Sequence, residues 1–148
     1  MYSQFYRRTE TVDNVAIYWD ASAVLSALFK DRHSNDAYAK ANCDGFHVLT
    51  SLAYSEVCAV IARMHREQTI PEVFVSAAFE ALENGPWRFL TLSPDMAIMR
   101  SMSKKWPLRG ADLWHLCTAV TLKKQIPELS ILSYDNRLLV AAAGEGLN

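Results

Sequence analysis

The sequence predicts a single α/β domain, a three-layer α/β/α sandwich around a central, mainly parallel sheet of four to five strands. Short apolar runs typical of buried strands alternate along the chain with longer segments of helical spacing. Such alternation is typical of a parallel sheet with helices on both faces. The length of 148 residues and a hydrophobic content of 51% fit one ordinary domain with a sizeable core.

The individual elements follow from these patterns. The expected strands are residues 15–19, 46–49, 88–92 and 130–134. The expected helices are residues 22–29, 34–41, 51–66, 71–83, 94–106, 111–124 and 137–143. The domain should therefore cover residues 15–148. Residues 1–14 match no element and are expected to be a flexible N-terminal arm without an assigned function.

Composition and charge exclude several classes of protein. No apolar run approaches the roughly 20 residues that a membrane span needs, and no apolar segment follows the early arginines, so we expect a cytoplasmic protein without membrane contact. Cys43, Cys58 and Cys117 are odd in number and widely spaced, which favours reduced thiols. The formal net charge is −1, so a polyanionic partner must meet a local basic patch or bound cations.

Four acidic residues are expected at one edge of the sheet. Asp20 and Asp135 directly follow apolar strand runs. Glu56 lies about one turn into the helix after the second strand, and Asp112 lies in the first turn of a later helix. Because ligands of parallel sheets bind beyond the carboxyl ends of the strands, all four acids map to the same crevice.

Each acid alone has a simpler explanation, because Asp112 and Asp135 also fit the caps or first turns of helices. As a set, the four carboxylates would repel one another unless a cation joined them. Oxygen donors without a cluster of His and Cys indicate Mg²⁺ or Mn²⁺. Such an ion supports hydrolysis of phosphodiester bonds. We therefore expect one site for Mg²⁺ (or Mn²⁺).

Four segments around these acids resemble the PIN-domain family, most closely its small bacterial toxin ribonucleases of the VapC type. They are, in order, residues 18–24 (YWDASAV), 51–57 (SLAYSEV), 108–119 (LRGADLWHLCTA) and 133–138 (SYDNRL). The resemblance runs from Ile17 to Gly146. The chain departs from the family's pattern chiefly in its long N-terminal arm.

The resemblance implies roles for the residues in these segments. It makes the four acids metal ligands, with Ser22 and Ser133 as supporting groups. It implies a PIN-like fold and a metal-dependent endoribonuclease that forms a homodimer. It further implies a toxin that is inhibited by an antitoxin protein, whose peptide enters the acidic groove. RNA, an antitoxin and a second copy of the chain are thus the expected partners.

Several other residues are candidates for the site. His115, three residues after Asp112, could contact substrate or a metal-bound water, or be a structural member of its helix. A basic cluster could bind RNA phosphates or be an ordinary solvated face; its members are Arg100, Lys104, Lys105 and Arg109. Trp106 and Trp114 fit core or dimer contacts better than base stacking.

Two rival functions remain to be separated from the nuclease. Phosphotransfer proteins also place aspartates at strand ends, but the phosphatase type needs a second aspartate where Ser22 stands, and no strand-terminal lysine occupies a receiver's position. A catalytically inactive PIN-like binding or assembly module would keep the fold without the chemistry. The presence of all four acids argues against that alternative, and an assay decides it.

Overall fold

The computed structural model describes residues 15–148, so the predicted N-terminal arm lies outside the described residues. Over this range the chain forms four strands and seven helices. The strands are β1 (Val15–Trp19), β2 (Gly45–Thr50), β3 (Trp87–Leu90) and β4 (Ser130–Leu132). The helices are α1 (Ala21–Leu28), α2 (Ser34–Ala41), α3 (Ser51–Arg66), α4 (Glu72–Asn84), α5 (Met96–Lys105), α6 (Gly110–Lys123) and α7 (Asn136–Gly144).

The sheet has the strand order β3-β2-β1-β4, and every pair of neighbouring strands is parallel. The predicted α/β fold is confirmed, with four strands in the described part of the chain. β1 is central, and its last residue, Trp19, lies opposite Leu132 of β4. The carboxyl ends of β1 and β4 are therefore adjacent, which brings the segments after them together.

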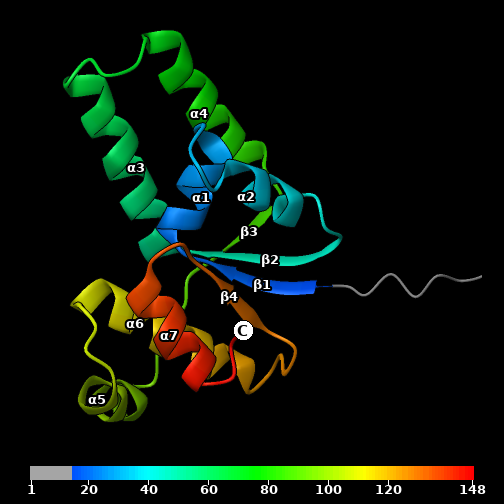
Figure 1. Cartoon of the computed structure of the whole chain (residues 1–148), viewed down its shortest axis with the longest axis vertical. Coiled ribbons are helices and arrows are strands. Elements are labelled where there is room, and N and C mark those ends of the chain that lie inside the picture. The colour runs from blue at the N-terminus through cyan, green and yellow to red at the C-terminus, as the bar shows by residue number, and fades with distance from the viewer. Residues whose placement is uncertain (1–14) are drawn as a thin grey trace, which may run out of the picture.

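Alternation along β1 divides the core between the two faces of the sheet. Ile17 and Trp19 pack in one cluster with residues of α1, α3 and α4. Ala16 and Tyr18 point to the opposite face and pack with residues of α6 and α7. Figure 1 shows these two helical layers, with α1 to α4 above the sheet and α5 to α7 below it. The three-layer α/β/α sandwich predicted from the sequence is thus present.

The C-terminal segment is joined to β4 by a backbone hydrogen bond. The backbone amide of Ile131 donates to the carbonyl of Leu147 at 2.7 Å, and the Leu147 side chain is fully buried. This C-terminal segment therefore packs beside the strand that leads to the acidic edge. None of the helices within residues 15–148 combines the length and apolarity that crossing a bilayer requires.

The observed boundaries differ from the predicted ones mainly at the carboxyl edge. The expected strands at residues 88–92 and 130–134 end two residues earlier, at Leu90 and Leu132. Helix α5 begins at Met96, since the Asp95 carboxylate caps it by accepting from the amide of Ala97 at 2.8 Å. Cys43, Cys58 and Cys117 are free thiols, as predicted.

Candidate functional site

Asp20 is the most deeply buried acid of the predicted set. It follows β1 directly, caps α1, and is only 4% exposed. Its Oδ1 accepts from the Ser22 hydroxyl at 2.7 Å and from the Ala23 amide at 2.9 Å, while Oδ2 accepts from Ser133 Oγ at 2.5 Å. Burial raises the pKa of Asp20, and the hydrogen bonds from Ser133, Ser22 and Ala23 oppose that rise. The carboxylate is therefore fixed in one orientation.

The hydroxyls of Ser22 and Ser133 also join the ends of β1 and β4. Ser22 Oγ accepts from the amide of Tyr134 at 3.0 Å, and Ser133 Oγ accepts from the amide of Asp135 at 3.0 Å. Both serines were expected only as supporting groups near the acids. Their contacts give them a defined function, which is to orient Asp20 and to hold the loop that carries Asp135.

Asp112 and Asp135 line a common pocket of about 440 Å³, which we call the acidic pocket. The other residues that line it are Arg109, Tyr134, Asn136 and Arg137. Asp135 caps α7, where its Oδ1 accepts from the amides of Arg137 and Leu138 at 2.9 and 3.1 Å. Asp112 lies in the first turn of α6. Both residues therefore have the helix-start positions that the simpler explanation required, and both still face one pocket.

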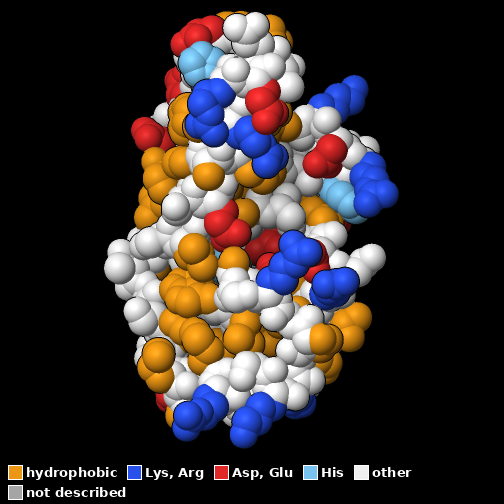
Figure 2. Space-filling model, turned by 90° about the vertical axis from the view of Figure 1, so that its left-hand side faces the viewer, with side chains coloured by type: hydrophobic (Ala, Val, Ile, Leu, Met, Phe, Trp, Pro, Cys, Tyr) orange, Lys and Arg blue, Asp and Glu red, His pale blue; other side chains and the backbone are white. Residues whose placement is uncertain are grey.

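The electrostatics of Asp112 link it to the other acids. Burial raises the pKa of Asp112, and the negative charges of Asp135, Asp20 and Glu56 raise it further, whereas His115 lowers it. Carboxylates from four segments that are distant in sequence thus lie close enough for their charges to influence the pKa of Asp112. Figure 2 shows acidic side chains in a hollow near the middle of one face, with basic side chains beside them.

Glu56, on α3, is held by a buried histidine. Nε2 of His115 lies 2.6 Å from Oε1 of Glu56, and Nδ1 of His115 lies 2.7 Å from the hydroxyl of Tyr18. Burial raises the pKa of Tyr18, so its hydroxyl keeps its proton and can donate to Nδ1. Nε2 then carries the proton that Glu56 accepts. His115 is 1% exposed, so it acts on the site through Glu56.

The predicted basic cluster is divided in the structure. Arg109 lines the acidic pocket, but Arg100, Lys104 and Lys105 lie on α5 around a separate surface pocket. Lys105 is paired with Glu145, with 2.6 Å between Nζ and Oε1. Arg137 was not among the predicted RNA contacts, yet it lines the acidic pocket. Its position two residues after Asp135, in the first turn of the same helix, was the available indication.

The two tryptophans considered for base stacking have structural contacts. The indole Nε1 of Trp106 donates to Glu145 at 2.8 Å, and a Cβ at Gly144 would meet the Trp106 ring at 2.3 Å, so the ring packs closely on α7. Trp114 meets the ring of His115 edge-on, with 5.6 Å between ring centroids.

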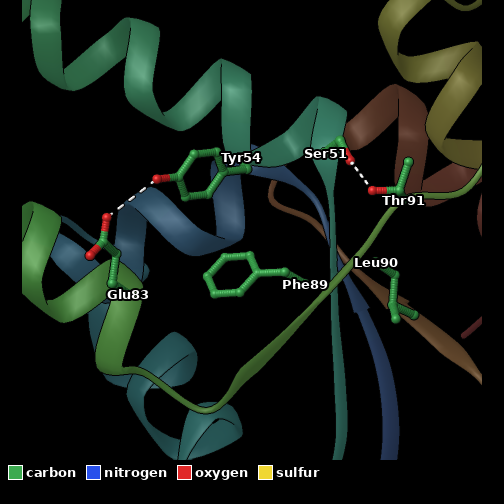
Figure 3. A pocket seen from close by; sticks show the side chains of 6 residues that line it. All are labelled: Ser51, Tyr54, Glu83, Phe89, Leu90 and Thr91. Atoms are coloured by element: carbon green, nitrogen blue, oxygen red, sulfur yellow. Dashed lines mark hydrogen bonds between the residues drawn. The ribbon is translucent and has the colours of Figure 1, made fainter.

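A second pocket, of about 480 Å³, opens beside β3 (Figure 3). The ring of Phe89 meets Tyr54 edge-on, and Ser51 donates to Thr91 at 3.2 Å across the pocket wall. The Tyr54 hydroxyl lies 3.5 Å from a carboxylate oxygen of Glu83. This largely apolar pocket contains none of the four predicted acids. The chemistry that the sequence suggests therefore belongs to the acidic pocket.

The fit of a metal ion can be judged from the donors. Within residues 15–148, no group of three or more His, Cys, Asp or Glu side chains is already arranged to hold an ion. The donor chemistry does fit a hard cation, because carboxylates from four segments share one field and raise the pKa of Asp112. Oxygens of Asp20, Glu56 and Asp135 already accept hydrogen bonds. Binding would thus use the second oxygen of Glu56 and of Asp135, and the lone pairs that these hydrogen bonds leave on Asp20.

Comparisons with known proteins extend only to the fold. No protein-family model matches the chain, and no curated protein sequence matches it. The crystal structure of PAE2754 from Pyrobaculum aerophilum is similar, with a TM-score of 0.60 over 97% of this chain and 90% of that chain. The two sequences are 15% identical. A similarity of this kind shows a shared architecture, and one architecture supports many activities.

Proposed function

We propose that this protein is a Mg²⁺- or Mn²⁺-dependent endoribonuclease that hydrolyses phosphodiester bonds of RNA. The observation that carries the proposal is that Asp112 and Asp135, from separate segments of the chain, line one pocket, and that Ser133 ties the buried Asp20 to the loop of Asp135. Carboxylates held together in this way favour a divalent cation, which neutralises their repulsion. The surrounding segments resemble PIN-domain ribonucleases in the same order along the chain, and this resemblance is the reason for proposing RNA hydrolysis.

The four acids would hold the ion, with Asp20, Asp112 and Asp135 as direct ligands and Glu56 as a ligand or a holder of metal-bound water. When bound, the ion activates a water and stabilises the charge that develops on the phosphate. Asp20 meets the ion already oriented by Ser22 and Ser133. His115 keeps one oxygen of Glu56 engaged and so limits the orientations that this carboxylate can take.

Arg109 and Arg137 would supply the contacts to RNA. Both line the pocket of Asp112 and Asp135, so their guanidinium groups can meet phosphates next to the bond that is cut. Their positive charge also offsets the repulsion between the acidic edge and a polyanion. With a net charge of only −1 over the chain, binding of RNA depends on such local cations.

The direct test is incubation of the purified protein with mixed cellular RNA, in Mg²⁺, Mn²⁺ or EDTA. We expect cutting in either metal and none in EDTA. Asp20→Asn and Asp112→Asn should abolish it. Asp95→Asn is the matched control, because this exposed cap of α5 lies outside the site and Asn also caps helices. Equal cutting by Asp20→Asn and wild type would refute the mechanism.

The cellular part of the proposal is that the protein is the toxin of a toxin-antitoxin pair and acts as a homodimer. It rests on the resemblance alone. Expression of the wild type should arrest growth of a bacterial host, and Asp20→Asn should not. A short upstream reading frame for a DNA-binding protein should relieve the arrest, and sedimentation should give twice the chain mass. Normal growth of cells that express the wild type would contradict the toxin role, whatever the result of the RNA cleavage assay.

An inactive PIN-like binding or assembly module is the second candidate. It would keep the pocket lined by Asp112 and Asp135 as a binding site without hydrolysis. In that case the acidic pocket would take a basic peptide, and no metal would change its thermal stability. RNA that stays intact at every metal concentration, with no shift of the melting temperature, would support this second function over the nuclease.

A further inference from the structure

A pair of stacked aromatic rings stands at the rim of the acidic pocket. The ring of His33, between α1 and α2, lies parallel to the ring of Tyr134, with 4.2 Å between centroids and 6° between planes. Tyr134 itself lines the pocket together with Asp112 and Asp135. The stack therefore leads from the acidic edge to the surface of the loop before α2.

Tyr134 is fixed from both ends of the residue. Its hydroxyl donates to Asp36 on α2 at 2.7 Å, and its backbone amide donates to Ser22, the residue that orients Asp20. Tyr134 is thus bound to the same Ser22 hydroxyl that positions Asp20. Movement of this ring relative to the pocket is restricted.

The loop that carries His33 is fixed as well. The His33 amide donates to Asp31 Oδ1 at 2.7 Å, and Asp31 Oδ2 accepts from Ser26 at 2.7 Å. Ser34 Oγ donates to the carbonyl of Phe29 at 2.8 Å. A platform with this many local hydrogen bonds is preorganised, so little ordering is needed when a ligand stacks on it.

The His33 ring is not used to build the helix. His33 is the N-cap residue of α2, but within the described residues its side chain makes no capping hydrogen bond. The residue remains partly exposed although Tyr134 covers one face of its ring. Arg32 donates through Nε to the His33 ring at 3.1 Å, and Lys30 and Arg32 are both exposed. Sites for single-stranded nucleic acid combine aromatic rings with cations, and here Arg32 contacts the ring while Lys30 lies three residues before it in the sequence.

We propose that His33 stacks on an unpaired base of a single RNA strand, and that Arg32 and Lys30 contact the adjoining phosphates. This inference rests on the proposed function and deepens it, because it assigns the residues that would hold an unpaired base and its phosphates beside the site of cleavage. An RNA strand bound in this way would place the phosphodiester bond to be cut next to the acids. A neighbouring base would then stack on His33. Bases in a duplex are already paired and stacked, so they offer no free face to His33.

Binding without cleavage tests the inference independently of catalysis. The probe is a fluorescein-labelled single-stranded RNA of roughly 12 nucleotides, within the range that such sites cover, with Ca²⁺ replacing Mg²⁺. We expect His33→Ala to weaken binding at least about fivefold, the lower end of what one stacked base contributes. His33→Phe should stay within about twofold of wild type, since it keeps a flat ring.

Stacking itself has a separate spectroscopic readout. 2-Aminopurine, placed at successive positions in the same RNA, should be quenched at one position by wild type and His33→Phe. His33→Ala should remove that quenching. His33→Leu still packs on Tyr134 but offers no aromatic face, so it should fold like wild type and also lose the quenching. His65→Ala is the matched control, because His65 is an exposed histidine on α3 that pairs with Glu72.

The outcomes separate this inference from the proposed function. Equal affinity of wild type and His33→Ala for single strands, or an equal loss for duplex RNA, would overturn the stacking site. Cleavage by His33→Ala with an unchanged KM would do the same and leave the nuclease standing. His33-dependent binding and quenching without any cleavage would support the stacking site and refute the nuclease. Failure of the wild type to bind single strands would overturn both.

Discussion

His115 donates from Nε2 to Oε1 of Glu56 across 2.6 Å, although the two residues lie 59 positions apart, on α6 and α3. The other ring nitrogen faces the hydroxyl of Tyr18 on β1. A core tyrosine thus selects the tautomer of a buried histidine, and that histidine sets the direction of an acid at the surface. The acidic edge is therefore organised from inside the core.

Replacing His115 should weaken Mg²⁺ binding by an amount that the loss of protein stability does not account for. His115→Leu frees Glu56 and takes the His115 acceptor away from the buried Tyr18 hydroxyl. We expect the Mg²⁺ concentration needed for half-maximal cleavage to rise roughly 10- to 100-fold. His115→Leu with Tyr18→Phe removes the stranded hydroxyl and should restore stability by about 1–3 kcal/mol without restoring the metal dependence. Mg²⁺ titrations of cleavage and urea unfolding measure the two effects.

Neutralising Asp112 should stabilise the metal-free protein. Its pKa in the folded protein lies above the ordinary value of 3.8, mainly because of burial and the charge of Asp135. Folding therefore favours the protonated form, so the stability from this group is present below the ordinary pKa and is lost as pH rises through the raised one. At pH 7, Asp112→Asn should raise the melting temperature by roughly 2–4 °C, or about 1 kcal/mol after solvent screening.

The same melting experiment tests whether Mg²⁺ binds at the acids. Mg²⁺ binds only the folded chain, so it should raise the melting temperature of wild type at pH 7. The increase should become smaller as the pH is lowered and protons compete for Asp112, whose pKa is raised, and it should be absent in Asp112→Asn. A rise of equal size in wild type and Asp112→Asn would contradict a role of Asp112 as a ligand.

Ser133→Ala should lower activity by weakening the hold on Asp20. The Ser133 hydroxyl is the largest influence that lowers the pKa of the buried Asp20 carboxyl, so its loss raises that pKa further. The acid limb of the pH–rate profile should then move to higher pH. We expect about 1–2 kcal/mol of lost stability, and Ser103→Ala, an exposed serine on α5, should change neither quantity.

Arg137 and Arg100 should differ in their contribution to RNA binding. Arg137 lines the pocket of Asp112 and Asp135, whereas Arg100 lies on α5 beside Lys104. Arg137→Ala should raise KM and reduce the slope of log affinity against log salt by about 0.7, the value for one phosphate contact to a single strand. Arg100→Ala removes the same charge and should leave the slope unchanged. Equal slopes for the two variants would place RNA elsewhere.

Local patterns were sufficient to predict the elements of this fold. The longest helix, α3, begins and ends where the spacing of Ala53, Val57 and Ile61 predicts, because helical periodicity is a property of neighbouring residues. Asp20 and Asp135 were predicted at strand ends because each directly follows an apolar run. The two serines were inferred only through a family resemblance, since nothing in a single sequence links Ser22 to Ser133 across 111 positions.

The sequence by itself determined the α/β class, the order of elements and the acids at the carboxyl edge, since these depend on local periodicity and on the ends of apolar runs. Only the tertiary structure decided which neighbours meet there. The placement of β4 beside β1 brought Ser133 to Asp20, and packing of α6 on the sheet buried His115 between Tyr18 and Glu56. Contacts of this kind depend on strand order and side-chain direction, which are properties of the assembled core.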